Sequence, residues 1–301
     1  MYIDQLVDQC WSIILLYIII LIIVFILLDE VVMSSSQRRI GPYNIGTYGI
    51  CSSLINGTNL IMTQLINVKL QFNYGFQLFP IIFMLISLLN YNIIYPFFLF
   101  DIYISVVIVL LFNTLSIIFL ILTAFSGGSK YSILGSIRLV TQLVSFELIY
   151  TTLLLILILS YNDVCIIHYW LYGNILFNIN WFYIIIYLLL LISILGDCNR
   201  TPFDLPEGES EIVAGFITEL SSIYFSMILL TEYGNIILLC SLLIILFSCT
   251  TISFILYLII ICLIRSSFLR FRYDELMIIA WVIILPFIFI LLLILLLILI
   301  N

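Results

Sequence analysis

Long apolar runs, interrupted by short polar segments, dominate the 301 residues of the chain. A helix needs about 20 apolar residues to cross a bilayer, because each residue advances it by about 1.5 Å. The run at 236–264 is predicted to be one long or tilted helix, since about 29 residues are too few for two crossings and a turn. The pattern therefore predicts one all-α integral membrane domain over residues 1–301, with eight transmembrane helices, at residues 11–28, 76–89, 102–125, 132–160, 181–196, 212–231, 236–264 and 276–300.

Charged residues, asparagines and prolines set the expected ends of these helices. The acids at 29–30 follow the first helix, and Glu232 ends the sixth. Residues 90–92 and Pro96 are predicted to break the chain between the second and third helices. Pro286 lies inside the eighth helix and is expected to kink it.

The segment after the first helix is too polar and too rich in glycine to cross a membrane, but residues 49–67 have a sided pattern. One helical stripe is apolar and the opposite stripe carries serine, threonine and asparagine. An amphipathic helix on or beside the membrane fits this pattern. A polar helix packed on a partner protein fits it nearly as well. The apolar stripe is Ile50, Leu54, Ile61 and Leu65, and the polar stripe is Ser52, Asn56, Asn59, Thr63 and Asn67.

The composition agrees with a membrane protein. Hydrophobic residues make up 65% of the chain and the mean hydropathy is +1.36, whereas apolar residues are about half of a soluble protein. Asp4 and Asp8 precede the first apolar run, which has no basic leader and no small-residue cleavage site. We therefore expect this run to be a permanent helix rather than a cleaved signal peptide.

Several kinds of cofactor site lack the residues that they would need. The seven cysteines contain no C-x-x-C pair, and there is one histidine, so neither an iron–sulfur cluster nor a zinc ion has its usual ligand spacing. No glycine-rich phosphate-binding motif occurs, and nucleotide binding has no support from the sequence. We expect any redox cofactor to be held by a partner protein.

The basic residues are segregated. With eight crossings, all nine fall on one side of the membrane or at its edge, in or near the connections after the first, third, fifth and seventh helices. Such segregation is what the positive-inside rule predicts, and a missed helix would destroy it. The nine are Arg38, Arg39, Lys69, Lys130, Arg138, Arg200, Arg265, Arg270 and Arg272.

Acidic residues mark the candidate chemistry. Glu147 and Glu219 lie inside apolar runs, where an ionisable group costs several kcal/mol unless it is paired, protonated or hydrated. We interpret them as proton-handling or ion-handling groups; the alternative is a neutral acid bonded to a neighbouring helix. Residues 197–211 hold five of the sixteen acids, and a solvated loop is the alternative to a functional role there. Arg138 and Gln142 share one face of the fourth helix, which would meet a polar partner surface, or Arg138 would snorkel.

One block of sequence is specific enough to suggest a family. Residues 199–205 read NRTPFDL, and residues 207–211 read EGESE. Together with further matches along essentially the whole chain, this block resembles the family of subunit 1 of the proton-pumping NADH:ubiquinone oxidoreductase, respiratory complex I. The further matches are Gln37, Arg39, Gly41, Pro42, Ser129, Lys130, Tyr131, Arg138, Gln142, Glu147, Gly215, Phe216, Glu219, Glu232, Tyr233, Arg270, Arg272 and Trp281.

The chain also departs from the family pattern. Asp197 stands where a glutamate is usual, and Val282 where a lysine is usual. Asn56 and Asn59 replace an aspartate and a lysine. These changes put in doubt any mechanism that needs charge on the amphipathic helix.

The resemblance implies an eight-helix subunit of the mitochondrial inner membrane, with the connections after helices one, three, five and seven in the matrix. It implies an oxidoreductase subunit with ubiquinone as substrate, with FMN and iron–sulfur clusters in partner subunits, and with no NADH, flavin, iron–sulfur or other metal site of its own. The implied partners are the peripheral subunits of the quinone module, the small membrane subunits of the pump arm, ubiquinone and the lipid bilayer, but not nucleic acid.

The resemblance also implies two sets of site residues, and no residue is assigned a catalytic role. One set would begin the acidic path for protons: Glu147, Asp197, Glu207, Glu209, Glu211, Glu219 and Glu232. The other would line or support the ubiquinone tunnel: Arg39, Arg200, Asp204, Phe216, Arg270 and Arg272.

Two other functions remain open at this point. The chain could be the membrane anchor of a related hydrogenase or dehydrogenase complex, which the co-purifying subunits would reveal. It could also be a secondary transporter with an acidic gate. A transporter predicts an internal repeat of broken helices, and the two halves of the chain contain no corresponding pair.

Overall fold

The computed structural model describes residues 2–41, 49–62, 74–94, 105–126, 130–161, 181–205, 220, 222–247 and 251–300. Every regular element within these residues is helical, which confirms the predicted all-α class for this part of the chain. The elements are α1 (Tyr2–Ser36), α2 (Ile50–Met62), α3 (Tyr74–Ile94), α4 (Ser105–Ser126), α5 (Lys130–Tyr161), α7 (Trp181–Asp197), α9 (Ser222–Phe247), α10 (Thr251–Ser267), α11 (Tyr273–Ile278), the π-helix η3 (Ile279–Ile284) and α12 (Leu285–Ile300).

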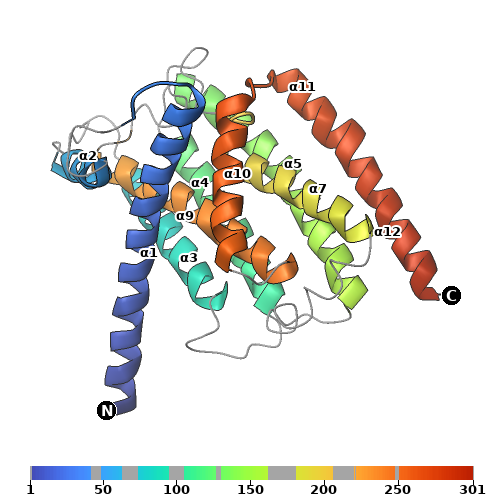
Figure 1. Cartoon of the computed structure of the whole chain (residues 1–301), viewed down its shortest axis with the longest axis horizontal. Helices are drawn as coiled ribbons and strands as arrows, with labels where there is room; N and C mark the ends of the chain where they lie inside the picture. Colours follow the sequence, from blue (N-terminus) through green and yellow to red (C-terminus); the bar gives the residue numbers. More distant parts are fainter. Residues whose placement is uncertain are drawn as a thin grey trace.

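The helices form one bundle, with α1 at one edge and α11 to α12 at the opposite edge (Figure 1). Helix α3 packs on α4 and α9, α5 packs on α4 and α7, and α10 packs on α1 and α9. The main hydrophobic cluster runs through the middle of α5, α7 and α9. Polar side chains are buried beside it, among them Gln142, Arg200 and Glu232, and buried polar groups need partners.

Within the part of the chain that the structure describes, five helices are long and apolar enough to cross a membrane: Leu16–Ser36, Ser105–Ser126, Lys130–Tyr161, Ile223–Phe247 and Tyr273–Leu297. Three more apolar helices are shorter, namely Leu78–Tyr91, Phe182–Asp197 and Ser253–Ser267. These segments fit a membrane protein. The expected number of eight crossings stays a prediction, because the shorter helices do not reach the required length.

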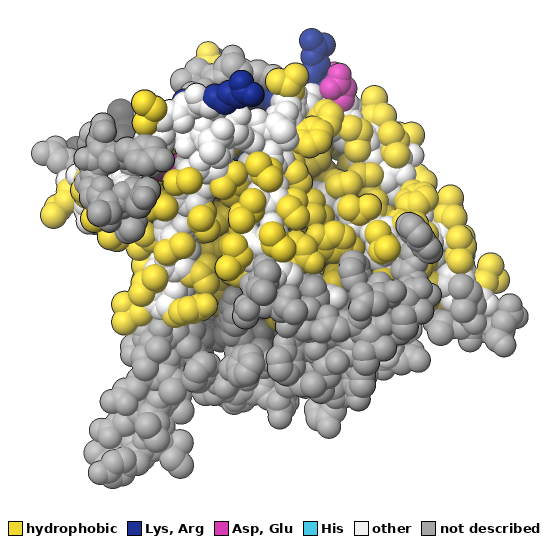
Figure 2. Space-filling model, in the orientation of Figure 1, with side chains coloured by type: hydrophobic (Ala, Val, Ile, Leu, Met, Phe, Trp, Pro, Cys, Tyr) yellow, Lys and Arg dark blue, Asp and Glu magenta, His cyan; other side chains and the backbone are white. Residues whose placement is uncertain are grey.

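The sidedness of the basic residues stays a prediction, and one face of the molecule shows where some of them lie. On the face drawn in Figure 2, hydrophobic side chains cover the flanks of the bundle, and lysine and arginine gather at the end where α1 ends and α11 begins. A bilayer around the apolar flank would leave these cations at one boundary, as the positive-inside rule requires.

The predicted boundary between the sixth and seventh helices is wrong. Helix α9 continues from Ser222 to Phe247, and α10 begins at Thr251, so residues 236–264 are not one helix. Polarity at Glu232 suggested an end, but this residue is 6% exposed and paired with Arg200 inside the bundle. A polar residue that is buried with a partner does not need to end a helix. Most of the predicted sixth helix, residues 212–219, lies outside the described residues.

Two other helices also continue through polar residues that were expected to end them. Helix α1 extends past Asp29, which forms an ion pair with Arg265 of α10. Helix α3 runs through residues 90–92 as far as Ile94. There the Tyr91 hydroxyl donates to the carbonyl oxygen of Gly234 in α9. Contacts between helices thus bind the Asp29 carboxylate and the Tyr91 hydroxyl, and neither helix ends at these residues.

Helix α2 covers the first part of the predicted amphipathic segment, whose residues 63–67 lie outside the described part. It packs against α1 and α9. Ser52 and Ser53 are buried, whereas Leu54 and Asn56 are exposed. Both predicted stripes therefore have exposed members, and the membrane-surface role of this helix stays a prediction.

The irregularity expected at Pro286 takes the form of a π-helical turn just before it. The N–H of Leu285 bonds the carbonyl oxygen of Ala280, five residues earlier. A proline has no N–H, and its ring clashes with the carbonyl group four residues back. The wider turn moves that carbonyl away from the ring.

Candidate functional site

Residues 198–205, here called the 198–205 loop, follow α7 and lie inside the bundle. Asn199, Arg200 and Phe203 are all less than 10% exposed. Asn199 has a φ of 49°, a left-handed conformation that asparagine adopts more readily than most residues. A buried loop must find partners for its backbone polar groups. The interpretation as a solvated loop is therefore wrong for these residues.

Gln142 of α5 supplies several of these partners. Its Nε2 atom donates to the carbonyl oxygen of Gly196 at 3.2 Å, to Oδ1 of Asn199 at 3.1 Å and to the carbonyl oxygen of Phe203 at 2.5 Å. Gln142 is completely buried. The polar face predicted on this helix thus meets a polar surface of the same chain.

The opposite side of the loop is fixed to the end of α10 and to the segment between α10 and α11. The backbone N–H of Phe271 donates to the carbonyl oxygen of Pro202 at 3.1 Å, and the Thr201 hydroxyl donates to the carbonyl oxygen of Arg265 at 3.2 Å. The Phe203 ring stacks on Phe271 with centroids 5.7 Å apart. The loop therefore couples α5 to the segment that carries Arg270 and Arg272.

Arg200 points its guanidinium group at α9. Its Nη2 atom lies 3.9 Å from Oε2 of Glu232, and its Cζ atom lies 4.2 Å from the centre of the Tyr233 ring. Both charged side chains are less than 10% exposed. A desolvated ion pair beside an aromatic face is held by attraction that water would otherwise screen.

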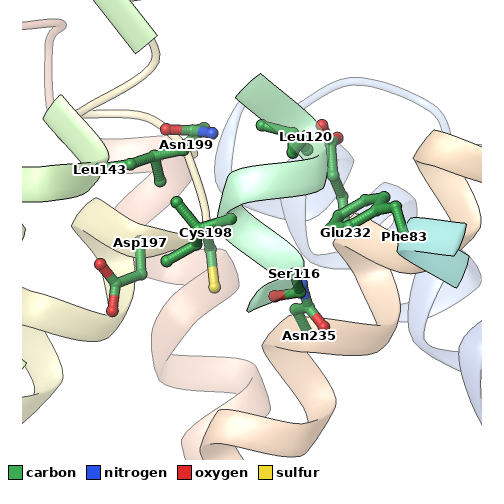
Figure 3. A pocket seen from close by; sticks show the side chains of 10 residues that line it. Phe83, Ser116, Leu120, Leu143, Asp197, Cys198, Asn199, Glu232 and Asn235 are labelled. Carbon is green, nitrogen blue, oxygen red and sulfur yellow. The ribbon is translucent and has the colours of Figure 1, made fainter. Parts of the chain in front are cut away.

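A small cavity of about 20 Å³ lies between the end of α7 and α9, with Asp197 and Glu232 on opposite sides of it (Figure 3). About 10–15 Å³ is enough to hold one water molecule. The lining is unusually polar for the interior of this bundle. It consists of Phe83, Ser116, Ile117, Leu120, Leu143, Asp197, Cys198, Asn199, Glu232 and Asn235.

Cys198 lies between the two acids in Figure 3. Burial raises the pKa of the Cys198 thiol well above its usual range, and the adjacent Asp197 carboxyl group adds to the rise. The thiol therefore keeps its proton at neutral pH, and a protonated, buried thiol is a poor nucleophile and a poor metal ligand. Cys198 contributes packing to this site.

Among the described acids, Asp197 differs in how its carboxylate is buried. Both of its carboxylate oxygens are buried and have no hydrogen-bond partner among the described residues. In Figure 3 its side chain points away from Glu232 and Asn235. Glu147, on α5, acts on it electrostatically. The structure thus brings together two acids that the sequence placed on one path.

Four other predicted residues lie in the described part of the chain. Arg39 and Arg272 are exposed, and Asp204 is partly buried. The Nε and Nη2 atoms of Arg270 are buried without a hydrogen-bond partner among the described residues. Five predicted residues lie outside the described part of the chain: Glu207, Glu209, Glu211, Phe216 and Glu219.

Ser116 and Asn235 also line the cavity, and the sequence pattern did not predict them. Asn235 follows Glu232 by three residues and therefore shares its helix face, which was a usable signal. Ser116 is one of several small polar residues in α4 and had no such signal. Within the described residues, no group of three His, Cys, Asp or Glu side chains could hold a metal ion.

Comparison with known proteins identifies the family. The family model described as NADH dehydrogenase matches residues 9–296. NADH-ubiquinone oxidoreductase chain 1 of Hyaloraphidium curvatum is 34% identical over 262 residues, covering 84% of this chain and 85% of the relative. The corresponding chain 1 of Chondrus crispus is 33% identical over 283 residues, covering 83% of each chain. An NADH-quinone oxidoreductase subunit of Pelagibacter ubique is 33% identical over 278 residues, covering 83% of this chain and 82% of the relative. With this coverage and the all-helical, apolar fold, the chain belongs to the NADH dehydrogenase family of complex I membrane subunits.

Proposed function

We propose that the chain is a core membrane subunit of a proton-pumping NADH:ubiquinone oxidoreductase in the mitochondrial inner membrane. It forms part of the wall of the ubiquinone tunnel and the start of the acidic path for protons. FMN and iron–sulfur clusters in partner subunits supply the electrons. The connections after the first, third, fifth and seventh helices face the matrix.

The ion pair between Arg200 and Glu232 carries this proposal. Arg200 belongs to the set expected at the tunnel, and Glu232 belongs to the set expected on the proton path. Their contact inside an apolar bundle gives the two sets a direct electrostatic connection. A change of charge on the tunnel side of Arg200 would alter the field at Glu232, because water screens charges weakly at a buried site.

The chain's own groups suggest how coupling proceeds. Reduction of ubiquinone takes up two electrons and two protons, which changes the charge beside the 198–205 loop. Arg200 transmits this change to Glu232. The polar cavity separates Glu232 from Asp197 and has room for water, and Glu147 lies beyond Asp197 in electrostatic range. Protons held at these three carboxylates can then respond to the state of the tunnel.

Neutralising single acids tests the proton path. In the purified complex, we expect Asp197→Asn and Glu147→Gln each to lower the coupled ubiquinone reductase rate and proton pumping by at least about tenfold, since a relayed proton transfer contributes about 10²–10⁴ in rate. NADH oxidation by an artificial electron acceptor should stay unchanged. Asp274→Asn, which alters an exposed acid, is the matched control. Full pumping in both variants would exclude the proposed path.

A map of the complex with a tunnel-blocking inhibitor tests the other half of the proposal. We expect density for the inhibitor in contact with the 198–205 loop and with Arg270 or Arg272. Arg270 should then use its buried Nε and Nη2 atoms to bind the inhibitor or a neighbouring carboxylate. An inhibitor bound far from this loop and from Arg200 would rule out the tunnel assignment.

A further inference from the structure

Two buried polar groups on neighbouring helices share the same peculiarity. The Tyr150 hydroxyl of α5 and both carboxylate oxygens of Asp197, at the end of α7, are buried without a hydrogen-bond partner among the described residues. Tyr150 is 1% exposed. A buried polar atom that lacks a partner is unfavourable, because it has lost its hydrogen bonds to water. Two such groups on helices that pack together suggest that one bound water serves both.

The packing of the two helices brings these groups to the same side. Helix α5 packs along α7, and the Phe146 ring lies where a side chain on Gly196 would be, only 2.3 Å from the position of its Cβ. Gly196 directly precedes Asp197, and Tyr150 follows Phe146 by four residues, which places both α5 side chains on one face. Among the neighbouring groups that act electrostatically on the Tyr150 hydroxyl, Asp197 has the largest effect, ahead of Cys198.

The direction of the Asp197 side chain agrees with this pairing. Figure 3 shows its carboxylate turned away from Glu232 and Asn235, on the far side of Cys198. The cavity therefore does not explain the orientation. A hydrogen-bond partner on the α5 side would explain this orientation of the Asp197 side chain. Glu147, also on α5, acts on Asp197 electrostatically.

We propose that Tyr150 is a positioning residue of the proton path, and that its hydroxyl donates a hydrogen bond to a bound water, which in turn donates to the Asp197 carboxyl group. A phenol keeps its proton at neutral pH and can therefore donate to this water. A buried water needs two to four polar partners, and the Asp197 oxygens together with the Tyr150 hydroxyl supply them. The hydrogen bond from this water holds Asp197 in the orientation from which it exchanges a proton with Glu147. This inference rests on the proposed function.

Removal of the hydroxyl alone tests the proposal. Tyr150→Phe in the intact complex should lower the coupled ubiquinone reductase rate at least about tenfold, because the Asp197 carboxyl group loses the hydrogen bond that holds its orientation. It should also increase the solvent deuterium isotope effect on that rate, which a purely structural role would not do. Tyr183→Phe is the matched control, since Tyr183 is a buried tyrosine near the other end of α7. Its effect should be less than about twofold.

A double-mutant cycle separates this inference from the proposed function. If Tyr150 acts through Asp197, adding Tyr150→Phe to Asp197→Asn should have no further effect on the rate. Additive losses of rate in the double variant, or an unchanged rate and isotope effect in Tyr150→Phe, would overturn the role of Tyr150. A loss of rate in Asp197→Asn would still support the proton path in that case. If neither single variant changed pumping, the proposed function itself would fail at Asp197.

A measurement on the unmodified complex does not depend on the assembly of any variant. A map that resolves ordered water should place the Tyr150 hydroxyl oxygen about 2.5–3.0 Å from a water that also contacts an Asp197 oxygen. A Tyr150 hydroxyl bonded only to another group would contradict the proposal.

Discussion

Arg200→Met is expected to destabilise the subunit within its complex by about 3–5 kcal/mol, the usual consequence of removing one member of a buried ion pair. The substitution takes the guanidinium group away from the Glu232 carboxylate and from the face of the Tyr233 ring. Glu232 then keeps a buried charge without its cation. The yield of assembled complex and its rate of thermal inactivation measure the effect.

Changing both partners provides the control for this prediction. The double variant Arg200→Met with Glu232→Leu removes both charges, so the yield of assembled complex should recover relative to Arg200→Met alone. Coupled ubiquinone reduction should not recover, because the double variant lacks the electrostatic link. Arg200→Met complexes as stable as the unmodified complex would show that the pair is hydrated rather than buried.

Gly196→Ala is expected to give the second large loss of stability. The new methyl group would lie 2.3 Å from Cγ and 2.5 Å from Cδ1 of Phe146. Phe146 is fully buried, and the contact reaches the part of its ring nearest the backbone, which cannot swing away. Overpacking of a core costs about 1–3 kcal/mol, and here it also disturbs the Gly196 carbonyl group that accepts from Gln142. The temperature of inactivation of the complex is the measurement.

A second substitution should relieve this overpacking. Phe146→Ala removes Cγ and all the ring atoms that the methyl group would strike. The loss of stability caused by Gly196→Ala should therefore be smaller in a Phe146→Ala background than in the unmodified chain. Gly57→Ala is the matched control, because nothing lies within 4 Å of a Cβ atom at Gly57. If Gly196→Ala and Gly57→Ala changed the temperature of inactivation equally, the close approach of α5 to α7 would be contradicted.

Hydropathy predicted the helices of the described part well, and their ends less well. Apolar runs identified α4, α5 and α7 to within a few residues, since a bundle in lipid needs apolar surface along its whole length. The errors at Asp29 and Glu232 have one cause. Each residue is buried against a cation from a distant part of the chain. Hydropathy treats every charged residue as exposed, so it cannot predict an ion pair between distant residues.

The sequence predicted most residues of the candidate site but not the contacts between them. The family pattern placed Arg200 and Glu232 in separate sets, and their contact emerges only in three dimensions. Gln142 was recognised on a polar face, while its bonds to Asn199 and Phe203 depend on the path of a buried loop. Tyr150 gave no signal at all, because a tyrosine in an apolar helix resembles an ordinary core residue.

The π-helical turn in the last helix has a consequence for how relatives of this chain should be aligned. Leu276, Ala280, Ile284 and Ile288 are all buried, although a step of four residues overshoots an α-helical turn by about 40° each time. The wider turn at 279–284 absorbs that drift and keeps both halves of the helix facing the core. A relative one residue shorter here would form an unbroken α-helix with the same two faces. A one-residue gap between 279 and 284 is therefore structurally neutral, whereas the same gap elsewhere in this helix would rotate its lipid-facing side into the core.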